Sequence, residues 1–573
     1  MDARSSTLTR AIQSGWAALL LFAGLSVAAT WPLARGLGRD VPGDYGDPLF
    51  TAWAMAWVSR QAGRALTGHL DAITQLWSAN QLYPEPAALS LSDHFIAQAL
   101  PLAPAYWVTH NALLVLGLAY LIAFTLNGFC AWLLAREITG SAAAGVLAGC
   151  TFAFQPFFLV YEISHLQVIS AWGMPLALYG LRRYFARGAL SGLLLGAAGV
   201  ILLSLSAGYY MVMFPLFILL YAGWEIMARR RWSDGRMWGE LVFAGAGVVV
   251  ALAPVLKVYV ETRQRLGLVR SAAETTQMSA SMTGYADALW PLMIPFSCAA
   301  VAVTAALAAR VGPSRHRPPL TGLVVIGAAL AFWLSLGPSP VLGGRAFPAL
   351  GLYRLLLEFV PGMDALRVSS RFAVAFVLFL SMGAGLGAAV LARARRGAVV
   401  VVVLAIVSVW LNTPPTFPLN RELPSTAGVR PPAAYLAPAP RAPAVYRYLA
   451  SLPASSVIAE LPFTDLWYTT RYLYFSTFHW HPLVNGFTSF FPPDFDERVR
   501  WLVNPVRTPD EAFGALQAAG TTHVVVHTGA WDEDYVGALE DWLVARGARS
   551  HGTFDGAAVY EIGRARLENG VRR

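Results

Sequence analysis

Long apolar runs separated by short polar connections dominate the first 412 residues of the chain. Runs of spanning length occur at 15–33, 111–135, 141–160, 166–183, 189–207, 209–228, 238–258, 287–309, 319–337, 370–391 and 397–412. Since about 20 apolar residues carry a helix across a bilayer, the pattern predicts about eleven membrane spans. The connections at 161–165 and 208–210 are the shortest, so the spans beside them are the least distinct.

The connections alternate in charge along the chain. One set carries the arginines Arg4, Arg10, Arg136, Arg182, Arg183, Arg187, Arg229, Arg230, Arg231, Arg236, Arg310, Arg315, Arg317, Arg393, Arg395 and Arg396. With eleven spans they all fall on one side, which the positive-inside rule assigns to the cytoplasm. The N-terminus is then cytoplasmic, and the first outer loop, 34–110, and everything after residue 412 face the periplasm or cell exterior. The run 15–33 has no small-residue cleavage site and is interpreted as an uncleaved first helix.

Composition supports a polytopic membrane protein. Hydrophobic residues make up 56% of the chain and charged residues 13%, whereas soluble proteins average about 25% charged. The formal net charge of +9 would suggest nucleic acid in a soluble protein. Here topology explains most of the arginines, so we expect the lipid bilayer, and no nucleic acid, as a partner. The three cysteines lie in apolar runs, and no CxxC or HExxH spacing indicates a metal site.

Beyond residue 412 the composition changes twice. A proline-rich stretch, 413–440, predicts an extended linker. The remainder, 441–573, alternates short apolar runs with helical patterns and predicts a small extracytoplasmic α/β domain. Its expected strands are 456–461, 521–527, 550–554 and 557–562, and its expected helices are 494–503, 509–519 and 530–547. We therefore expect three regions: a transmembrane domain 1–412, the linker 413–440 and the domain 441–573.

The first outer loop opens with the hexapeptide 43–48, Gly-Asp-Tyr-Gly-Asp-Pro. Two glycines and a proline around two carboxylates predict a tight, exposed turn. Asp44 and Asp47 could serve there as a general base or a metal-bridging pair. The alternative is an Asx-type turn of purely structural value. The following residues, 47–61, predict an amphipathic helix lying in the membrane interface, with Asp47 near its N-cap.

Other polar groups fall at the expected outer boundary. Asp93 and His94 lie later in the first loop and are candidates for substrate binding. Glu162 and His165 are spaced i, i+3 in a very short connection, where they could bind a sugar hydroxyl or a phosphate, or assist proton transfer. A capped turn is the alternative.

Two arginines stand where an outer loop enters a span. Arg367 and Arg371 are spaced i, i+4, and two guanidinium groups on one helix face make a clamp for a phosphate. Ordinary lipid phosphate would satisfy the same clamp.

The layout resembles the GT-C superfamily of membrane glycosyltransferases. The similarity covers one span, a long outer loop that opens with 43–48, many further spans and a soluble outer domain. Short motifs also resemble bacterial GT-C-like proteins: Ser164-His165, 366–372 (Leu-Arg-Val-Ser-Ser-Arg-Phe), 459–463 (Ala-Glu-Leu-Pro-Phe) and 485–487 (Asn-Gly-Phe). The resemblance implies a bacterial cytoplasmic (inner) membrane location, a polyprenyl-phosphate sugar donor and an essential acid in the first outer loop.

This resemblance leads to a hypothesis and two alternatives. In the hypothesis Asp44 or Asp47 deprotonates the acceptor of an inverting sugar transfer, while Arg367 and Arg371 hold the donor phosphate. A transporter or flippase of a lipid-linked glycan, or a non-catalytic scaffold in envelope biogenesis, would need no base. No Asp-x-Asp motif lies between spans and no Trp-Trp-Asp motif is present. The need for a divalent cation, and whether the acceptor is a glycan, a lipid or a protein, stay open.

Overall fold

The computed structural model describes residues 14–310, 320–426 and 428–563. Arg4, Arg10, Arg315 and Arg317 of the charged connections lie outside these residues. The chain divides into two compact units. The helical unit contains the chain up to Arg35, Ala119–Lys257 and Leu268–Phe417, and the loop–sheet unit contains Gly36–Leu118, Val258–Gly267 and the chain from Pro418. This division differs from the linear one expected from composition, because the first loop and the C-terminal residues share a unit.

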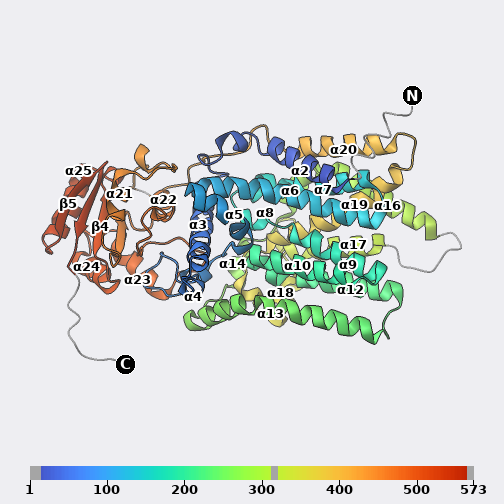
Figure 1. Cartoon of the computed structure of the whole chain (residues 1–573), viewed down its shortest axis with the longest axis horizontal. Coiled ribbons are helices and arrows are strands. Elements are labelled where there is room, and N and C mark those ends of the chain that lie inside the picture. The colour runs from blue at the N-terminus through green and yellow to red at the C-terminus, as the bar shows by residue number, and fades with distance from the viewer. Residues whose placement is uncertain (1–13, 311–319, 427, 564–573) are drawn as a thin grey trace. The chain divides into compact units, whose positions relative to one another are not determined.

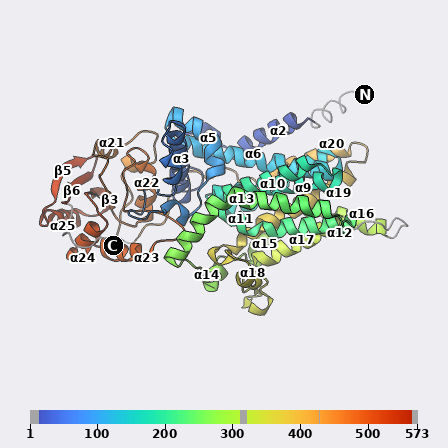
Figure 2. The same cartoon turned by 60° about the horizontal axis from the view of Figure 1, so that its bottom comes forward.

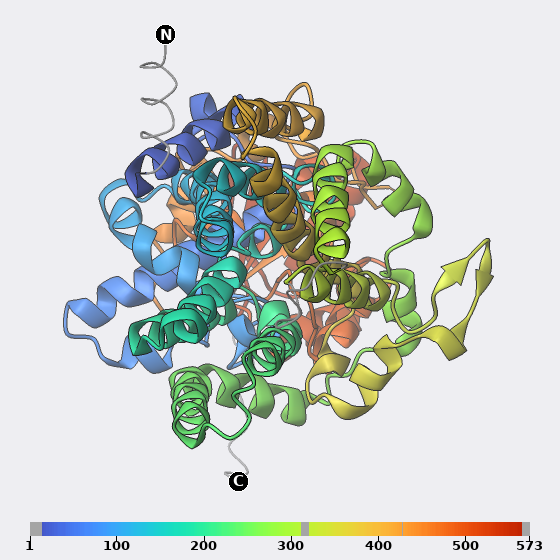
Figure 3. The same ribbon diagram turned by 90° about the vertical axis from the view of Figure 1, so that its right-hand side faces the viewer.

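Helices coincide with each expected span. They are α2 (Gly15–Ala29), α6 (Ala112–Thr139), α7 (Ala142–Ala153), α8 (Leu166–Ile169), α9 (Gly173–Arg187), α10 (Leu190–Ser206), α11 (Gly208–Met213), α12 (Pro215–Arg229), α13 (Gly235–Leu266), α15 (Met282–Leu289), α16 (Met293–Arg310), α17 (Leu320–Ser335), α19 (Ala373–Leu391) and α20 (Gly397–Asn412). Shorter elements between them are η3 (Phe157–Tyr161), α14 (Ala272–Gln277), β1 (Val341–Leu342), β2 (Arg345–Ala346), η4 (Pro348–Leu350), α18 (Tyr353–Phe359), η5 (Met363–Ala365) and η6 (Ser369–Phe372), and η1 (Leu33–Gly36) follows α2. Figure 3 looks along this bundle.

Fewer helices than expected from the sequence meet the criteria of length and apolar composition for a membrane span. In the described residues, five helical stretches are long and apolar enough to cross a membrane, or six if a pair bent by 91° counts as one span. Four further apolar helices, α2, α10, α17 and α20, are shorter. The expected count of eleven is therefore not confirmed, although the apolar helices do identify a polytopic helical membrane protein.

Small residues bring two helices of the bundle into backbone contact. A Cβ added at Gly180 of α9 would lie 2.3 Å from the backbone nitrogen of Gly196 in α10. Such close approach replaces side-chain packing with backbone packing, which is a common way to join helices in a membrane. α9 lies beside α10 and α12 (Figure 1, Figure 2).

The loop–sheet unit contains a four-stranded sheet in the order β3-β4-β6-β5. Strands β4 and β5 are labelled in Figure 1. Its strands are β3 (Ile458–Leu461), β4 (His523–His527), β5 (Arg549–Phe554) and β6 (Ala557–Glu561). β3 and β4 are parallel, the other pairs are antiparallel, and both β3 and β4 are buried along their whole length. The helices around the sheet are η7 (Ala434–Leu436), α21 (Ala444–Ala450), α22 (Leu466–Ser476), α23 (Pro493–Leu502), α24 (Pro509–Ala518), η8 (Thr528–Ala530) and α25 (Glu533–Val544). The four strands and the helices α23, α24 and α25 thus form within a few residues of the predicted positions, whereas α21 and α22 were not predicted.

The first loop packs into the same unit. Its helices are α3 (Asp47–Leu66), α4 (Asp71–Thr74), η2 (Ala88–Leu91) and α5 (Ile96–Thr109). The prediction that α3 lies in the membrane interface is wrong, because α3 packs against α5 and α22 and buries both Trp53 and Trp57. The indole of Trp53 donates a hydrogen bond to Asn80 at 3.0 Å. The tryptophans therefore serve the protein interior.

Candidate functional site

The predicted site residues fall into two groups, one in each unit. Asp44, Asp47, Asp93 and His94 belong to the loop–sheet unit. Glu162, His165, Arg367 and Arg371 belong to the helical unit.

Asp44 lies in a turn whose geometry depends on a glycine. Its carboxylate oxygen Oδ1 accepts the backbone N–H of Gly46 at 2.8 Å. A Cβ at Gly46 would lie 2.9 Å from Leu423 and 3.0 Å from this same oxygen. Gly46 is the N-cap of α3 and Asp47 is its first residue, where the helix dipole favours a negative charge. Both carboxylates are half-buried.

A short segment of the expected linker holds this turn through its backbone. The N–H of Gly43 donates to the carbonyl of Pro418 at 2.9 Å. Gly43 and Tyr45 then bracket Asp44 with two further bonds to Arg421, each 3.0 Å long. The backbone of Asp44 is therefore fixed by residues almost 380 positions away in the chain.

Arg471 supports the same turn from α22. Its side chain is only 2% exposed and forms a two-pronged ion pair with Glu422, at 2.9 and 3.0 Å. Its guanidinium group also stands 4.8 Å from the ring centre of Tyr45, the neighbour of Asp44. Sequence reasoning missed Arg471, although an arginine in the middle of an aromatic helix is an unusual burial that could have drawn attention.

Asp93 and His94 are buried in the loop–sheet unit. The ring of His94 meets Trp77 and Tyr259 edge to face, with centroids 5.9 and 6.0 Å away, and its Nδ1 accepts the N–H of Ile96 at 3.2 Å. Burial lowers the pKa of His94 to about 4, so the ring is neutral at pH 7. A role in substrate binding stays a prediction for both residues.

Three of the predicted residues meet in the helical unit. Glu162 Oε2 lies 3.0 Å from His165 Nδ1 and 3.2 Å from Arg371 Nη2, and Glu162 and Arg371 are both buried. Burial by itself raises the pKa of Glu162, but Arg371 and His165 outweigh it and lower the pKa to about 2. Arg371 also stands over the ring of Tyr209 at 4.2 Å. The i, i+3 pair from the sequence is therefore part of a larger charged cluster.

Arg367 does not share a helix face with Arg371. The chain is extended at Leu366 and turns into the 3₁₀ helix η6 only at Ser369. Arg367 instead approaches Glu274 at 3.8 Å, and Arg270 pairs with the same carboxylate oxygen at 2.9 Å. The predicted helical clamp is wrong in geometry, and Arg270 and Glu274 are partners of Arg367 that the sequence did not suggest.

Metal-ligand side chains do not gather in these units. Within residues 14–310, 320–426 and 428–563, no three His, Cys, Asp or Glu side chains lie close enough together to hold a metal ion.

Known proteins resemble this chain in structure rather than in sequence. No protein-family model and no curated protein sequence matches it. The mycobacterial arabinofuranosyltransferase AftD superimposes with a TM-score of 0.58 at 14% identity, over 95% of this chain and 40% of its own length. The oligosaccharyltransferase AglB of Archaeoglobus fulgidus, solved with an inhibitory peptide and a dolichol-phosphate, superimposes with a TM-score of 0.50 at 11% identity, over 97% of this chain and 75% of its own length. The chain thus has the fold of the GT-C superfamily of membrane glycosyltransferases.

Proposed function

We propose that the protein is a glycosyltransferase that moves a sugar from a polyprenyl-phosphate donor to an acceptor on the outer face of the cytoplasmic membrane. The observation that carries the proposal is a carboxylate turn held rigidly by backbone bonds in the first loop of a GT-C fold. A preorganised carboxylate is what proton removal from an acceptor requires.

Asp44 is the better candidate for the base. Its backbone is bracketed by the bonds to Arg421, whereas Asp47 occupies the first turn of α3, where the helix dipole stabilises its charge. In the reaction Asp44 takes the proton of the acceptor hydroxyl, and the acceptor oxygen forms a bond to the anomeric carbon. The bond from that carbon to the donor phosphate breaks at the same time, and the phosphate leaves with the electron pair. The configuration at the anomeric carbon is thereby inverted.

The arginines of the helical unit would take the donor phosphate. Arg270 and Arg367 lie beside Glu274, and Arg371 lies beside Glu162. Guanidinium groups bind phosphate oxygens through charge-assisted hydrogen bonds and can stabilise the charge on the leaving phosphate. The dolichol-phosphate bound to AglB supports a polyprenyl carrier for this fold.

The decisive experiment measures the release of polyprenyl phosphate from the sugar donor. The purified full chain is incubated with a panel of polyprenyl-phosphate sugars, and free polyprenyl phosphate is detected by mass spectrometry. Asp44→Asn should lower the rate about 10²–10⁴-fold, because the amide keeps the turn but cannot accept the proton. Asp71→Asn, an exposed carboxylate of the same loop paired with Arg64, is the matched control and should keep full activity. Full activity in both Asp44→Asn and Asp47→Asn would refute the base and favour a transporter.

A further inference from the structure

A second charged cluster lies at the far end of α9 from His165. Arg187 pairs with Glu137 at the end of α6, at 2.6 Å, and Arg182 pairs with Glu225 near the end of α12, at 2.8 Å. Tyr184 donates a hydrogen bond to Glu240 at the start of α13, at 2.6 Å. The ends of four helices therefore meet here, and we call this region the arginine end.

Positive charge is in excess at the arginine end. Its arginines are Arg136, Arg182, Arg183, Arg187, Arg229, Arg230, Arg231 and Arg236, and its carboxylates are Glu137, Glu225, Asp234 and Glu240. All four carboxylates are engaged in ion pairs. Arg230 is exposed, and its side chain makes no ion pair or hydrogen bond within the part of the chain that the structure describes. Its guanidinium group is thus available to an outside anion.

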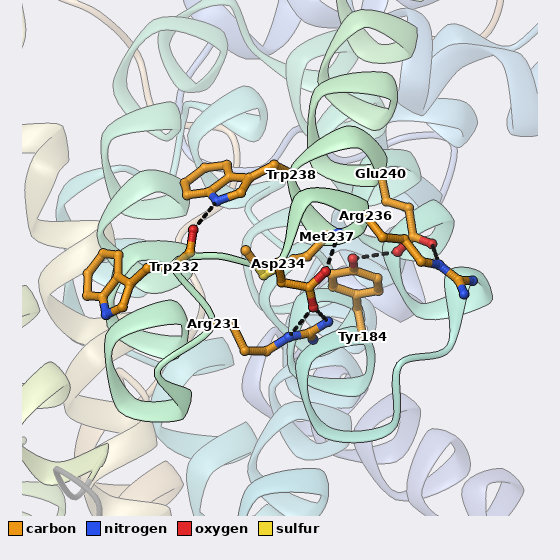
Figure 4. Close-up of polar contacts among 8 residues, drawn as sticks. All are labelled: Tyr184, Arg231, Trp232, Asp234, Arg236, Met237, Trp238 and Glu240. Atoms are coloured by element: carbon orange, nitrogen blue, oxygen red, sulfur yellow. Dashed lines mark hydrogen bonds and ion pairs between the residues drawn. The ribbon is translucent and has the colours of Figure 1, made fainter.

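Two tryptophans follow this arginine in the chain. Trp232 lies in the turn between α12 and α13, and Trp238 lies in the first turn of α13 (Figure 4). Trp232 is 59% exposed and Trp238 is 43% exposed. Trp238 donates its indole N–H to the carbonyl of Trp232 at 2.9 Å. Asp234 accepts the N–H of Met237 at 2.9 Å and pairs with Arg231, so the turn is held from within. These bonds fix the turn, and both indoles lie at its surface.

The exposed apolar face of α13 begins directly after these tryptophans. Val242 is 69% exposed and Phe243 is 75% exposed, and only 11% of the most apolar part of α13 is buried. Such a face needs acyl chains around it. Tryptophan favours the boundary between acyl chains and headgroups. Arg230 and Trp232 come just before this apolar face in the chain, which is the position expected of residues at the depth of lipid phosphates.

We propose that Arg230, which shortly precedes Trp232 and Trp238 in the chain, binds the phosphate of an anionic phospholipid of the surrounding bilayer. The excess of arginines selects a lipid of net negative charge over a zwitterionic one. The apolar face of α13 favours a lipid over a soluble anion as the ligand, because this face can contact the acyl chains of a lipid whose phosphate is bound by Arg230. This inference does not depend on the proposed transferase activity.

The backbone of Arg230 makes a clean test available. Its φ of 54° and ψ of 40° lie in the left-handed region that glycine adopts without strain. Arg230→Gly therefore removes the charge while relaxing the turn. Arg230→Lys is the matched control because it keeps a cation at the same place.

The measurement uses the full chain purified in detergent and titrated with phosphatidylglycerol or phosphatidylcholine, with bound lipids counted by native mass spectrometry. The unaltered chain should bind phosphatidylglycerol more tightly. Arg230→Gly should weaken that binding about five-fold, the effect of one arginine at a membrane surface, and leave phosphatidylcholine binding unchanged. Arg230→Lys should retain most of the preference.

Three results would overturn the inference. One is equal binding of the two lipids to the unaltered chain. Another is undiminished phosphatidylglycerol binding by Arg230→Gly, or by Arg230→Gln if the glycine variant does not fold. The third is displacement of the lipid by millimolar inorganic phosphate, which would identify a site for free anions.

Discussion

The two groups of candidate residues are held in place by different forces. The turn around Asp44 is fixed by backbone hydrogen bonds to Pro418 and Arg421. The cluster around Glu162 is fixed by the charges of its own members, Arg371 and His165. A side chain on a backbone-fixed turn can change without disturbing its neighbours, whereas a buried charge that loses its partner is left uncompensated. The comparison therefore predicts opposite responses to removal of a single carboxylate charge.

Glu162→Gln should give the largest loss of stability. Arg371 would lose the charge that compensates it while remaining buried, and breaking a buried pair from one side costs roughly 3–5 kcal/mol. Thermal unfolding of the purified chain in detergent would measure the loss. Adding Arg371→Met should restore much of it, because the buried charge is then gone. A single variant as stable as the original chain would mean that the cluster is not held by this pair.

Acid should act on the two groups over different pH ranges. Burial lowers the pKa of His94 to about 4. The stabilisation that the neutral ring gives to the folded state is therefore complete above pH 6.5 and is lost as the pH falls from 6.5 towards 4. At pH 5 the loss is about 2 kcal/mol. The pKa of Glu162 is lowered to about 2, so its contribution is complete above pH 4.5 and is lost only below that value.

Hydrogen exchange at pH 7 and pH 5, corrected for intrinsic rates, would separate these ranges. Amides around Ile96 should become less protected at pH 5. His94→Gln should remove this difference, since its amide does not titrate. Equal protection of these amides at both pH values in the unaltered chain would contradict the assignment of a buried, neutral His94.

Arg471→Met should have a smaller effect on stability and a local effect on the turn. Glu422 is half exposed, so water can solvate it after its partner is lost, and the loss should be about 1 kcal/mol. The amides of Gly43 and Tyr45 should exchange faster, because Tyr45 loses the guanidinium group above its ring. Glu422→Gln, which keeps Arg471 over Tyr45, is the control. Unchanged exchange in Arg471→Met would show that the backbone bonds alone hold the turn.

Asp44→Asn should have the smallest effect on stability. The amide oxygen can still accept the N–H of Gly46, so the free energy of unfolding should change by less than about 0.5 kcal/mol. Thermal unfolding beside Glu162→Gln would test the contrast directly. A loss as large as that of Glu162→Gln would mean that the charge of Asp44, and not its backbone, holds the turn.

Local patterns in the sequence determined the apolar helices, the strands of the four-stranded sheet and one contact of the site. Apolar runs predict helices because a chain in a bilayer must satisfy the hydrogen bonds of its own backbone. The run of three valines in β4 predicts a buried strand. Glu162 and His165 could be paired from their spacing, since residues three apart share one side of a turn.

Only the tertiary structure decided which partners complete the sites. Arg371 reaches Glu162 from 209 positions away, and Arg471 reaches Tyr45 across an even longer separation. The tryptophans of α3 were predicted to face the membrane, but they are buried in the protein. An amphipathic pattern does not show whether the apolar face contacts lipid or protein. Arg367 and Arg371 were predicted to share one helix face. That spacing places two residues on one face only where the backbone is helical, and here it is not helical from Leu366 to Val368. Sequence spacing fixes geometry only within one regular element, and contacts between distant elements depend on how the whole chain packs.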